Sequence, residues 1–178
     1  MRFLFVIDMQ NDFIDGPLGT PEALAIVPAV KKKINKYRKN GDYVIFTRDT
    51  HHPDYMETLE GKNLPVKHCI KGTPGWQIRD ELEADPFHIV DKYTFGYYDW
   101  FTYIANMIPD ELEEGEYLES IEIIGLCTDI CVISNAMILK SLFTETPIIV
   151  DSKCCAGVTP ESHKNALEAM KMCQINVI

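Results

Sequence analysis

The chain has 178 residues, of which 46% are hydrophobic and 25% charged, a composition typical of one globular domain and unlike that of a disordered segment. Asp and Glu outnumber Lys and Arg by 27 to 17, which gives a net charge of −10. This charge argues against a nucleic acid or an anionic membrane as partner, because phosphate binding requires clustered basic side chains.

Apolar runs and helical patterns alternate along the chain. We expect strands at residues 3–7, 43–47, 87–90, 121–126, 147–150 and 175–178, and helices at residues 23–39, 76–83, 98–108, 132–142 and 160–172. We expect a loop at residues 49–74 and an acidic, exposed excursion at residues 110–119. The basic run 31–33 is expected to form a solvated helix face. Apolar strands separated by helices predict a single-domain, three-layer α/β/α sandwich with a mainly parallel sheet.

Polar and nucleophilic side chains follow four of the predicted strands. Asp8 follows the first strand, Asp49 and His51 the second, Lys92 the third and Cys131 the fourth. Ligands of parallel α/β sheets bind outside the carboxyl ends of the strands, so we expect these residues to meet at one edge. A thiol is nucleophilic as its thiolate, which a base, a nearby cation or a helix N-terminus favours. An acid, an amine and a thiol at this edge would form an activated nucleophile.

Three motifs resemble those of the isochorismatase-like cysteine hydrolases, in the same order and over nearly the whole chain. Residues 8–13 (DMQNDF) resemble the opening motif, residues 125–132 (GLCTDICV) the nucleophile turn, and Lys92 lies between them, where the family keeps its catalytic lysine. Residues 49–51 (DTH) and 68–75 (HCIKGTPG) resemble the metal-site segments of the nicotinamidase branch. The resemblance implies this family's Rossmann-like fold and the hydrolysis of a small carboxamide such as nicotinamide, through a thioester, with release of ammonia.

Carried over to this chain, the resemblance makes Cys131 the nucleophile, Asp8 the general acid/base and Lys92 the third member of a catalytic triad. It also implies an oxyanion hole formed by the backbone amides of Cys127 and Cys131, with a cis peptide between Leu126 and Cys127. The physical chemistry agrees, since Asp8 can accept the thiol proton and return it to the leaving amine while Lys92 stabilises both anions. Cys127 is the rival nucleophile, but it precedes the helix whose field would favour a thiolate.

The resemblance further implies one divalent metal ion, zinc, iron or manganese, bound by Asp49, His51 and His68. One carboxylate and two imidazoles suit these metals, and the alternative is that all three are ordinary polar loop residues. His52 adjoins one of the ligands and is not assigned to the site. Phe13 is the expected substrate contact, holding a small planar amide in a small pocket that rejects bulky amides.

Two departures from the nicotinamidase pattern concern the substrate. That branch has an aromatic residue shortly before the histidine that matches His68, whereas residues 64–67 (LPVK) contain none. It usually has a glycine after the lysine that matches Lys92, where this chain has Tyr93. The alternative substrate is therefore an N-carbamoyl or ureido compound, hydrolysed by the same triad. Hydrolysis of isochorismate is disfavoured, because that branch lacks the nucleophilic cysteine that Cys131 supplies.

Two functions outside catalysis are the alternatives to this one. A phospho-acceptor signalling domain also has an aspartate after its first strand and a late lysine, here Asp8 and Lys153, but it lacks a Thr-Asp-x-Cys turn. A degenerate hydrolase domain kept for binding would not need the complete set Asp8, Lys92 and Cys131.

Location and assembly follow from the composition and the resemblance. The N-terminal apolar run is too short and too soon charged for a signal peptide, and no segment approaches the roughly 20 apolar residues of a membrane span. We therefore interpret the six cysteines as reduced thiols of a cytoplasmic protein. Members of the family often form dimers or tetramers, so the resemblance implies a homo-oligomer that acts on a small-molecule amide.

Overall fold

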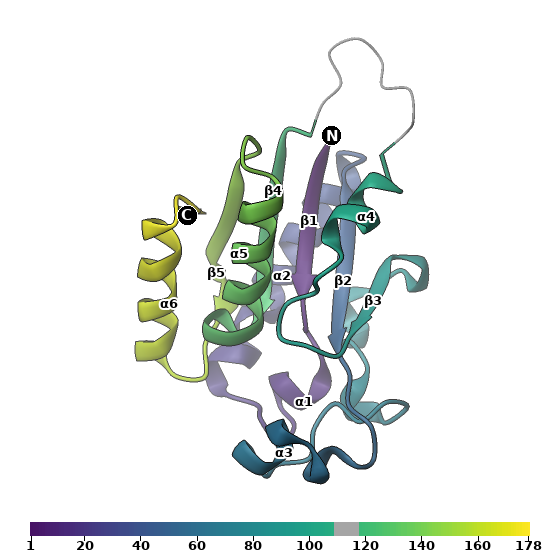
Figure 1. Cartoon of the computed structure of the whole chain (residues 1–178). Coiled ribbons are helices and arrows are strands. Elements are labelled where there is room, and N and C mark those ends of the chain that lie inside the picture. Colours follow the sequence, from purple (N-terminus) through teal and green to yellow (C-terminus); the bar gives the residue numbers. More distant parts are fainter. Residues whose placement is uncertain (109–117) are drawn as a thin grey trace.

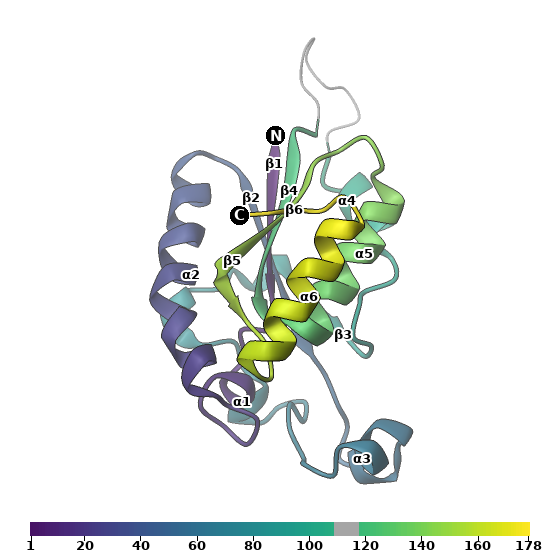
Figure 2. The ribbon, with the colours of Figure 1, turned by 90° about the vertical axis from the view of Figure 1, so that its left-hand side faces the viewer.

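The computed structural model of the chain describes residues 1–108 and 118–178 and contains a six-stranded parallel sheet in the order β3-β2-β1-β4-β5-β6. The strands are β1 (Arg2–Ile7), β2 (Tyr43–Asp49), β3 (Ile89–Lys92), β4 (Ser120–Leu126), β5 (Ile148–Ala156) and β6 (Asn176–Val177). The α-helices are α1 (Asn11–Ile14), α2 (Pro21–Lys39), α3 (Leu59–Asn63), α4 (Trp100–Ala105), α5 (Ile133–Leu142) and α6 (Pro160–Met172). Helix α2 covers one face of the sheet, and α4, α5 and α6 cover the other (Figures 1 and 2). The predicted three-layer sandwich is confirmed.

The apolar run of β1 is explained by burial on both faces of the sheet. Phe3, Phe5 and Ile7 belong to the core on the side of α4, α5 and α6. Leu4 and Val6 point the other way, into the core beneath α2. Successive side chains of a strand face opposite sides, so a strand covered by helices on both sides needs apolar residues at every position.

The two long helices end at the predicted residues, and α2 begins two residues before its predicted start. Thr20 caps α2 through its side chain, and Gly41, with a φ of +76°, follows the residue that ends this helix. Helix α6 begins after Thr159, which forms a reciprocal capping box with Ser162, and its bounds agree with the prediction.

Other predicted elements differ from the observed ones. The helix predicted at residues 76–83 is replaced by 3₁₀ turns at Pro74–Trp76 and Asp80–Leu82, because Ile78 forms an isolated bridge with Gln10. Strand β5 continues beyond the predicted residue 150, past a register shift relative to β4. The acidic excursion predicted at residues 110–119 lies almost entirely outside the described residues. No helix in the described ranges is long and apolar enough to cross a membrane.

The basic run 31–33 is not simply a solvated face. The ammonium group of Lys33 lies 2.5 Å from Glu122 of β4 and 2.8 Å from Asp151 of β5, with a side chain that is only 16% exposed. Tyr37, one turn further along α2, donates a hydrogen bond of 2.6 Å to the other oxygen of Glu122. A polar cluster thus lies between α2 and the sheet, and its ion pairs compensate the cost of burying the charges.

The carboxyl ends of the strands converge on one edge, where chemistry can be assembled. Asp8 follows β1, Asp49 and Lys92 are the last residues of β2 and β3, and the turn after β4 carries Cys131. Strands β1 and β4 are adjacent at the point where the strand order reverses, which is where open α/β sheets bind ligands. A side chain at Gly125 would meet the carbonyl oxygen of Ile7 at 2.1 Å, so the two strands approach closely because this position is glycine.

Candidate active site and metal centre

A buried ammonium group joins the three residues predicted to form the triad. Nζ of Lys92 lies 2.6 Å from Oδ2 of Asp8 and 3.5 Å from Sγ of Cys131. All three side chains are buried. Nζ also donates to the carbonyl oxygen of Thr94 at 3.3 Å, which helps to fix its position. Three strand ends, far apart in the sequence, therefore place an acid, an amine and a thiol within contact distance.

The carboxylate of Asp8 is held by a neighbouring strand. Oγ1 of Thr47, on β2, donates to Oδ1 of Asp8 at 2.6 Å and accepts the backbone N–H of Asp8 at 3.1 Å. Asp8 has a φ of +46°, in the left-handed region that non-glycine residues seldom adopt. This backbone conformation and the paired hydrogen bonds leave Oδ2 of Asp8 for Lys92.

The pKa values of all three groups are raised, by burial or by the neighbouring charges. Burial raises the pKa of Asp8 above its usual range, although the ammonium group of Lys92 opposes the shift. Burial alone would lower the pKa of Lys92, but the negative charges around it raise that pKa well above its ordinary value. Burial also raises the pKa of Cys131, and the carboxylate of Asp8 adds to this effect. Burial thus opposes the ionisation of Asp8 and Cys131, whereas the ammonium group of Lys92 favours it.

The turn after β4 begins with a cis peptide between Leu126 and Cys127, as expected. A single π turn, Thr128–Val132, follows and places Cys131 directly before α5. Neither Thr128 nor Asp129 caps α5 through its side chain. Oγ1 of Thr128 lies 2.7 Å from Nδ1 of His163 on α6, and the carboxylate of Asp129 accepts the N–H of Val158 at 3.1 Å. Both side chains thus tie the turn to the segment around α6.

Cys127, the rival nucleophile, lines the same cavity as Cys131. Burial raises the pKa of Cys127 to about 12. The hydrogen bond from Lys92 goes to Cys131. The electrostatic support for a thiolate is therefore directed at Cys131.

Four side chains with metal-binding atoms meet beside the triad: Asp49, His51, Glu60 and His68, whose ligand atoms all lie within 4.8 Å of one another. Oδ2 of Asp49 lies 2.9 Å from Nε2 of His51 and 3.7 Å from Nε2 of His68. Oδ1 of the same carboxylate lies 3.4 Å from Nζ of Lys92. Asp49 therefore connects this cluster to the triad.

The imidazoles present the nitrogens that a metal would need. Nδ1 of His68 lies 2.8 Å from the carbonyl oxygen of Val66, which can only accept, so a neutral imidazole would carry its proton on Nδ1 and present the lone pair of Nε2. Nε2 of His51 is buried and makes no aligned hydrogen bond within the described residues. A divalent cation would satisfy both nitrogens together with the two carboxylates, and this donor set suits zinc, iron or manganese.

Glu60 was missed by the sequence analysis. It lies on α3, a one-turn helix inside the segment expected to be a loop, and its Oε1 is 3.6 Å from Nε2 of His51. Its separation from the other candidate ligands follows no recognisable spacing. Only the capping residue Thr58, whose side chain accepts the N–H of Gly61, signals the helix that carries it.

The opening motif holds the metal-site loop in place. The side-chain amide of Gln10 accepts the N–H of Asp49 at 2.7 Å and donates to the carbonyl oxygens of Asp49 and Trp76. Asp12 accepts the N–H of Cys69 at 2.7 Å. The segment that contains His68 therefore folds back towards β2 because residues after β1 provide hydrogen bonds that it lacks locally.

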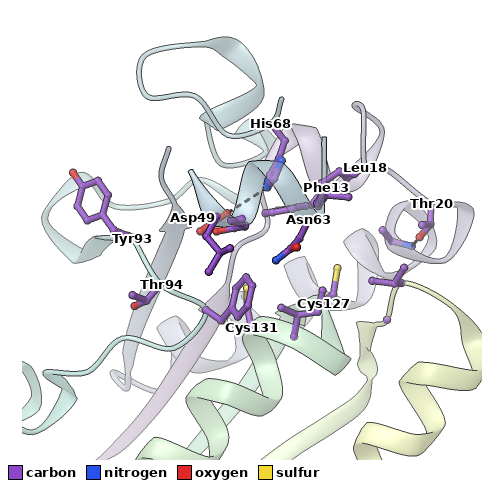
Figure 3. A pocket seen from close by; sticks show the side chains of 18 residues that line it. Phe13, Leu18, Thr20, Asp49, Asn63, His68, Tyr93, Thr94, Cys127 and Cys131 are labelled. Carbon is purple, nitrogen blue, oxygen red and sulfur yellow. Dashed lines mark hydrogen bonds and ion pairs between the residues drawn. The ribbon is translucent and has the colours of Figure 1, made fainter. Parts of the chain in front are cut away.

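A cavity of about 740 Å³ opens onto both the triad and the metal cluster. Figure 3 shows Asp49, His68 and Cys131 at its centre, with Phe13 beside His68. The rings of Phe13 and His68 are 5.4 Å apart, so Phe13 forms part of the wall as expected. The volume contradicts our expectation of a small pocket, because segments around α2, α3 and α6 extend the wall beyond the reacting residues.

Asn135 was also missed, although it fixes one wall of the cavity. Its Oδ1 accepts from the N–H of Tyr97 at 3.0 Å and from Nε1 of Trp100 at 2.8 Å. Its Nδ2 donates to the carbonyl oxygens of Cys131 at 2.7 Å and Phe95 at 3.2 Å. This buried amide thereby joins the helix that follows the nucleophile turn to the segment that follows Lys92.

The chain is similar to known proteins over nearly its whole length. The isochorismatase domain family matches residues 2–178. The nicotinamidase of Saccharomyces cerevisiae is 26% identical and covers 100% of this chain and 99% of its own. The structure of the Pyrococcus horikoshii pyrazinamidase in complex with zinc is 26% identical, with a TM-score of 0.79 over 99% of this chain and 98% of that one. The N-carbamoylsarcosine amidase of Thermoplasma acidophilum is 27% identical, with a TM-score of 0.75 over 99% and 94%.

Proposed function

The chain belongs to the isochorismatase family, and from this premise we propose that it is a cysteine amidohydrolase of the nicotinamidase branch, which releases ammonia from a small carboxamide. The observation that carries the proposal is the position of Lys92, whose ammonium group contacts both Asp8 and Cys131 in a buried site. Burying an ion pair costs free energy of desolvation. The position of this pair beside a thiol is explained if Cys131 acts as the nucleophile of covalent catalysis. The cytoplasmic location and the homo-oligomer stay predictions.

The first half of the reaction forms a thioester. Asp8 accepts the proton of the Cys131 thiol, and Sγ attacks the carbonyl carbon of the amide. The backbone amides of Cys127 and Cys131 stabilise the negative charge that develops on the carbonyl oxygen. As the tetrahedral species collapses, the C–N bond breaks and Asp8 donates its proton to the leaving nitrogen, which departs as ammonia.

The second half restores the thiol. Asp8 removes a proton from a water molecule, whose oxygen attacks the thioester carbon and expels the thiolate of Cys131. The thiolate takes the proton back from Asp8, and the carboxylic acid leaves. Lys92 stays protonated throughout and stabilises whichever neighbour carries the negative charge. One amide and one water are thus converted to one acid and one ammonia.

We propose that Asp49, His51 and His68, with Glu60, hold one divalent metal. The fit rests on the buried Nε2 of His51, on the free Nε2 of His68 and on the chemistry of the donor set. When bound, the metal would act as a Lewis acid that anchors a ring nitrogen or a carbonyl oxygen of the substrate. Phe13 would hold the planar part of that substrate beside His68.

An N-carbamoyl compound is the alternative substrate, and the similarity to N-carbamoylsarcosine amidase favours keeping it. The same triad would hydrolyse a terminal carbamoyl C–N bond. Substrates of this class that carry a carboxylate need a cation to bind it. Among the described residues that line the cavity none is Lys or Arg, which favours the neutral carboxamide.

The test is an ammonia-release assay on nicotinamide, a small aliphatic amide and an N-carbamoyl amino acid, with metal-loaded and chelated protein. We expect turnover of nicotinamide that is lost with Cys131→Ala and weakened by chelation. If only the N-carbamoyl compound released ammonia, the proposed substrate would change to that class, and the proposed cysteine mechanism would stand. Turnover that survives Cys131→Ala would remove the cysteine mechanism.

A further inference from the structure

The cavity is larger than the proposed reaction requires. A volume of about 740 Å³ lies in the range of sites that enclose drug-sized ligands, whereas nicotinamide is one pyridine ring with one carboxamide group. Figure 3 shows Leu18 and Thr20 on one side of the central group formed by Asp49, His68 and Cys131. The cavity therefore continues well beyond the reacting atoms.

Apolar residues from segments that take no part in the chemistry line part of this cavity. Leu18 lines it from the segment before α2, Ala23 from the first turn of α2, and Val158 from the turn before α6. Val158 is 52% exposed. We call this set, Leu18, Ala23 and Val158, the apolar lobe.

The mouth of the cavity is also apolar. Leu59 and Leu64 line it from around α3, and Phe95 lines it from the segment after Lys92. All three side chains are exposed, Leu59 by 77%. Exposed apolar residues that gather around a concave site commonly mark a ligand-binding surface.

The charges of the lining lie at the metal cluster alone. Among the described lining residues, the side chains able to carry a charge near neutral pH are Asp49, Glu60 and His68, and each contributes to that cluster. The apolar lobe thus offers nothing that would pair with a charged group on the substrate. Burying an unpaired charge there would be costly, whereas burying an alkyl group would be favourable.

We propose that the preferred substrate is a neutral carboxamide that carries an apolar substituent, which occupies the apolar lobe while the amide lies at Cys131. The inference rests on the proposed amidohydrolase function and specifies its substrate class. The substituent gains from leaving water, and it also excludes water from the oxyanion that forms at the cysteine turn.

The experiment compares ammonia release from nicotinamide, from propyl-substituted nicotinamides with the substituent at each free ring position, and from the carboxyethyl analogues of nearly the same size. We expect at least one propyl derivative to exceed nicotinamide in kcat/KM by about tenfold or more, because apolar contacts discriminate by about this factor per group. The matching carboxyethyl derivative should fall below nicotinamide.

A charge placed in the apolar lobe tests the location. Val158→Asp should lower the ratio of kcat/KM for the best propyl derivative to that for nicotinamide by about tenfold. Leu24→Asp is the matched control, since Leu24 follows Ala23 on α2, is similarly exposed at 51% and does not line the cavity. It should leave that ratio unchanged.

The outcomes separate this inference from the function on which it rests. Turnover of nicotinamide with every propyl derivative slower would overturn the substrate class and leave the amidohydrolase intact. An unchanged ratio in Val158→Asp would overturn the role of the apolar lobe. No ammonia from any amide, with the metal loaded, would overturn the proposed function and this inference with it.

Discussion

The ammonium group of Lys92 lies 2.6 Å from the carboxylate of Asp8, and both side chains are fully buried. The same ammonium group is 3.4 Å from Asp49, a residue of the metal cluster. One cation therefore compensates two carboxylates that belong to different parts of the site. Nucleophile activation and metal binding should be coupled through it, because the removal of any one charge leaves another uncompensated.

The first prediction concerns the stability of this pair. Lys92→Met should lower the free energy of unfolding by about 3–5 kcal/mol near neutral pH, because the Asp8 carboxylate is left buried without its partner. The double variant Asp8→Asn/Lys92→Met should recover a large part of that loss. Urea unfolding followed by circular dichroism measures both. A double variant no more stable than the single one would mean that the pair is not the source of the loss.

The second prediction separates the two cysteines of the nucleophile turn. Cys131→Ala should lower the rate of ammonia release by at least ~10³-fold, because covalent catalysis has no substitute for its nucleophile. Cys127→Ala, which keeps the backbone amide, should retain activity within about tenfold. Iodoacetamide should inactivate the wild-type enzyme, and peptide mass spectrometry should show that the loss of activity follows the labelling of Cys131. The reverse pattern of loss would assign the nucleophile to Cys127.

The third prediction tests the fourth metal ligand. Glu60→Gln should weaken zinc binding by about tenfold or more, since a ligand and its charge are lost together. Glu57→Gln removes an equal charge from an exposed position nearby and should change the affinity little. Isothermal titration of zinc into the metal-free protein gives both values. Equal affinities in the two variants would exclude Glu60 from the site.

The sequence predicts the parts of the site that parallel strands bring together. Asp8, Asp49, Lys92 and Cys131 each follow an apolar run, and a parallel sheet aligns the ends of such runs at one edge. The order and the spacing along the chain are enough for that inference. The expected wall residue, Phe13, follows because it belongs to the motif after the first strand.

Residues that reach the site only through tertiary contacts cannot be predicted from the order of the strands and motifs. Glu60 reaches the metal cluster from its own short helix, and Asn135 on α5 reaches Phe95 in the segment after Lys92. The volume of the cavity depends on side chains such as Leu18 and Val158, which come from distant segments. Neither periodicity nor motif spacing records these distances, so the small pocket expected from the catalytic residues alone was wrong.

The fourth prediction concerns Asn135. Asn135→Ala should lower the free energy of unfolding by about 1–3 kcal/mol, because Nε1 of Trp100 and the N–H of Tyr97 lose their shared buried acceptor. It should also raise KM more than it lowers kcat, since the segment that includes Phe95 lines the cavity. Ser141→Ala removes an exposed hydrogen bond from the same helix and should stay within about 0.5 kcal/mol of wild type. If Asn135→Ala and Ser141→Ala changed the free energy of unfolding and KM equally, Asn135 would have no positioning role.

The last prediction uses the polar cluster beneath α2, which is remote from the catalytic residues. Burial alone would raise the pKa of Asp151, but its hydrogen bond with Lys33 dominates and lowers that pKa below the usual range. A carboxyl group whose pKa is depressed by folding stabilises the protein above its unfolded pKa, about 4, and this stabilisation is lost as the pH falls through the folded value. Lys33→Met should therefore destabilise the protein near pH 7, and the difference from wild type should shrink as the pH falls towards about 3. Lys32→Met, an exposed neighbour on the same helix, is the control and should show no such dependence. Thermal unfolding of the three proteins across this range decides the matter, since a difference that is constant with pH would mean that Lys33 acts through packing rather than through its charge.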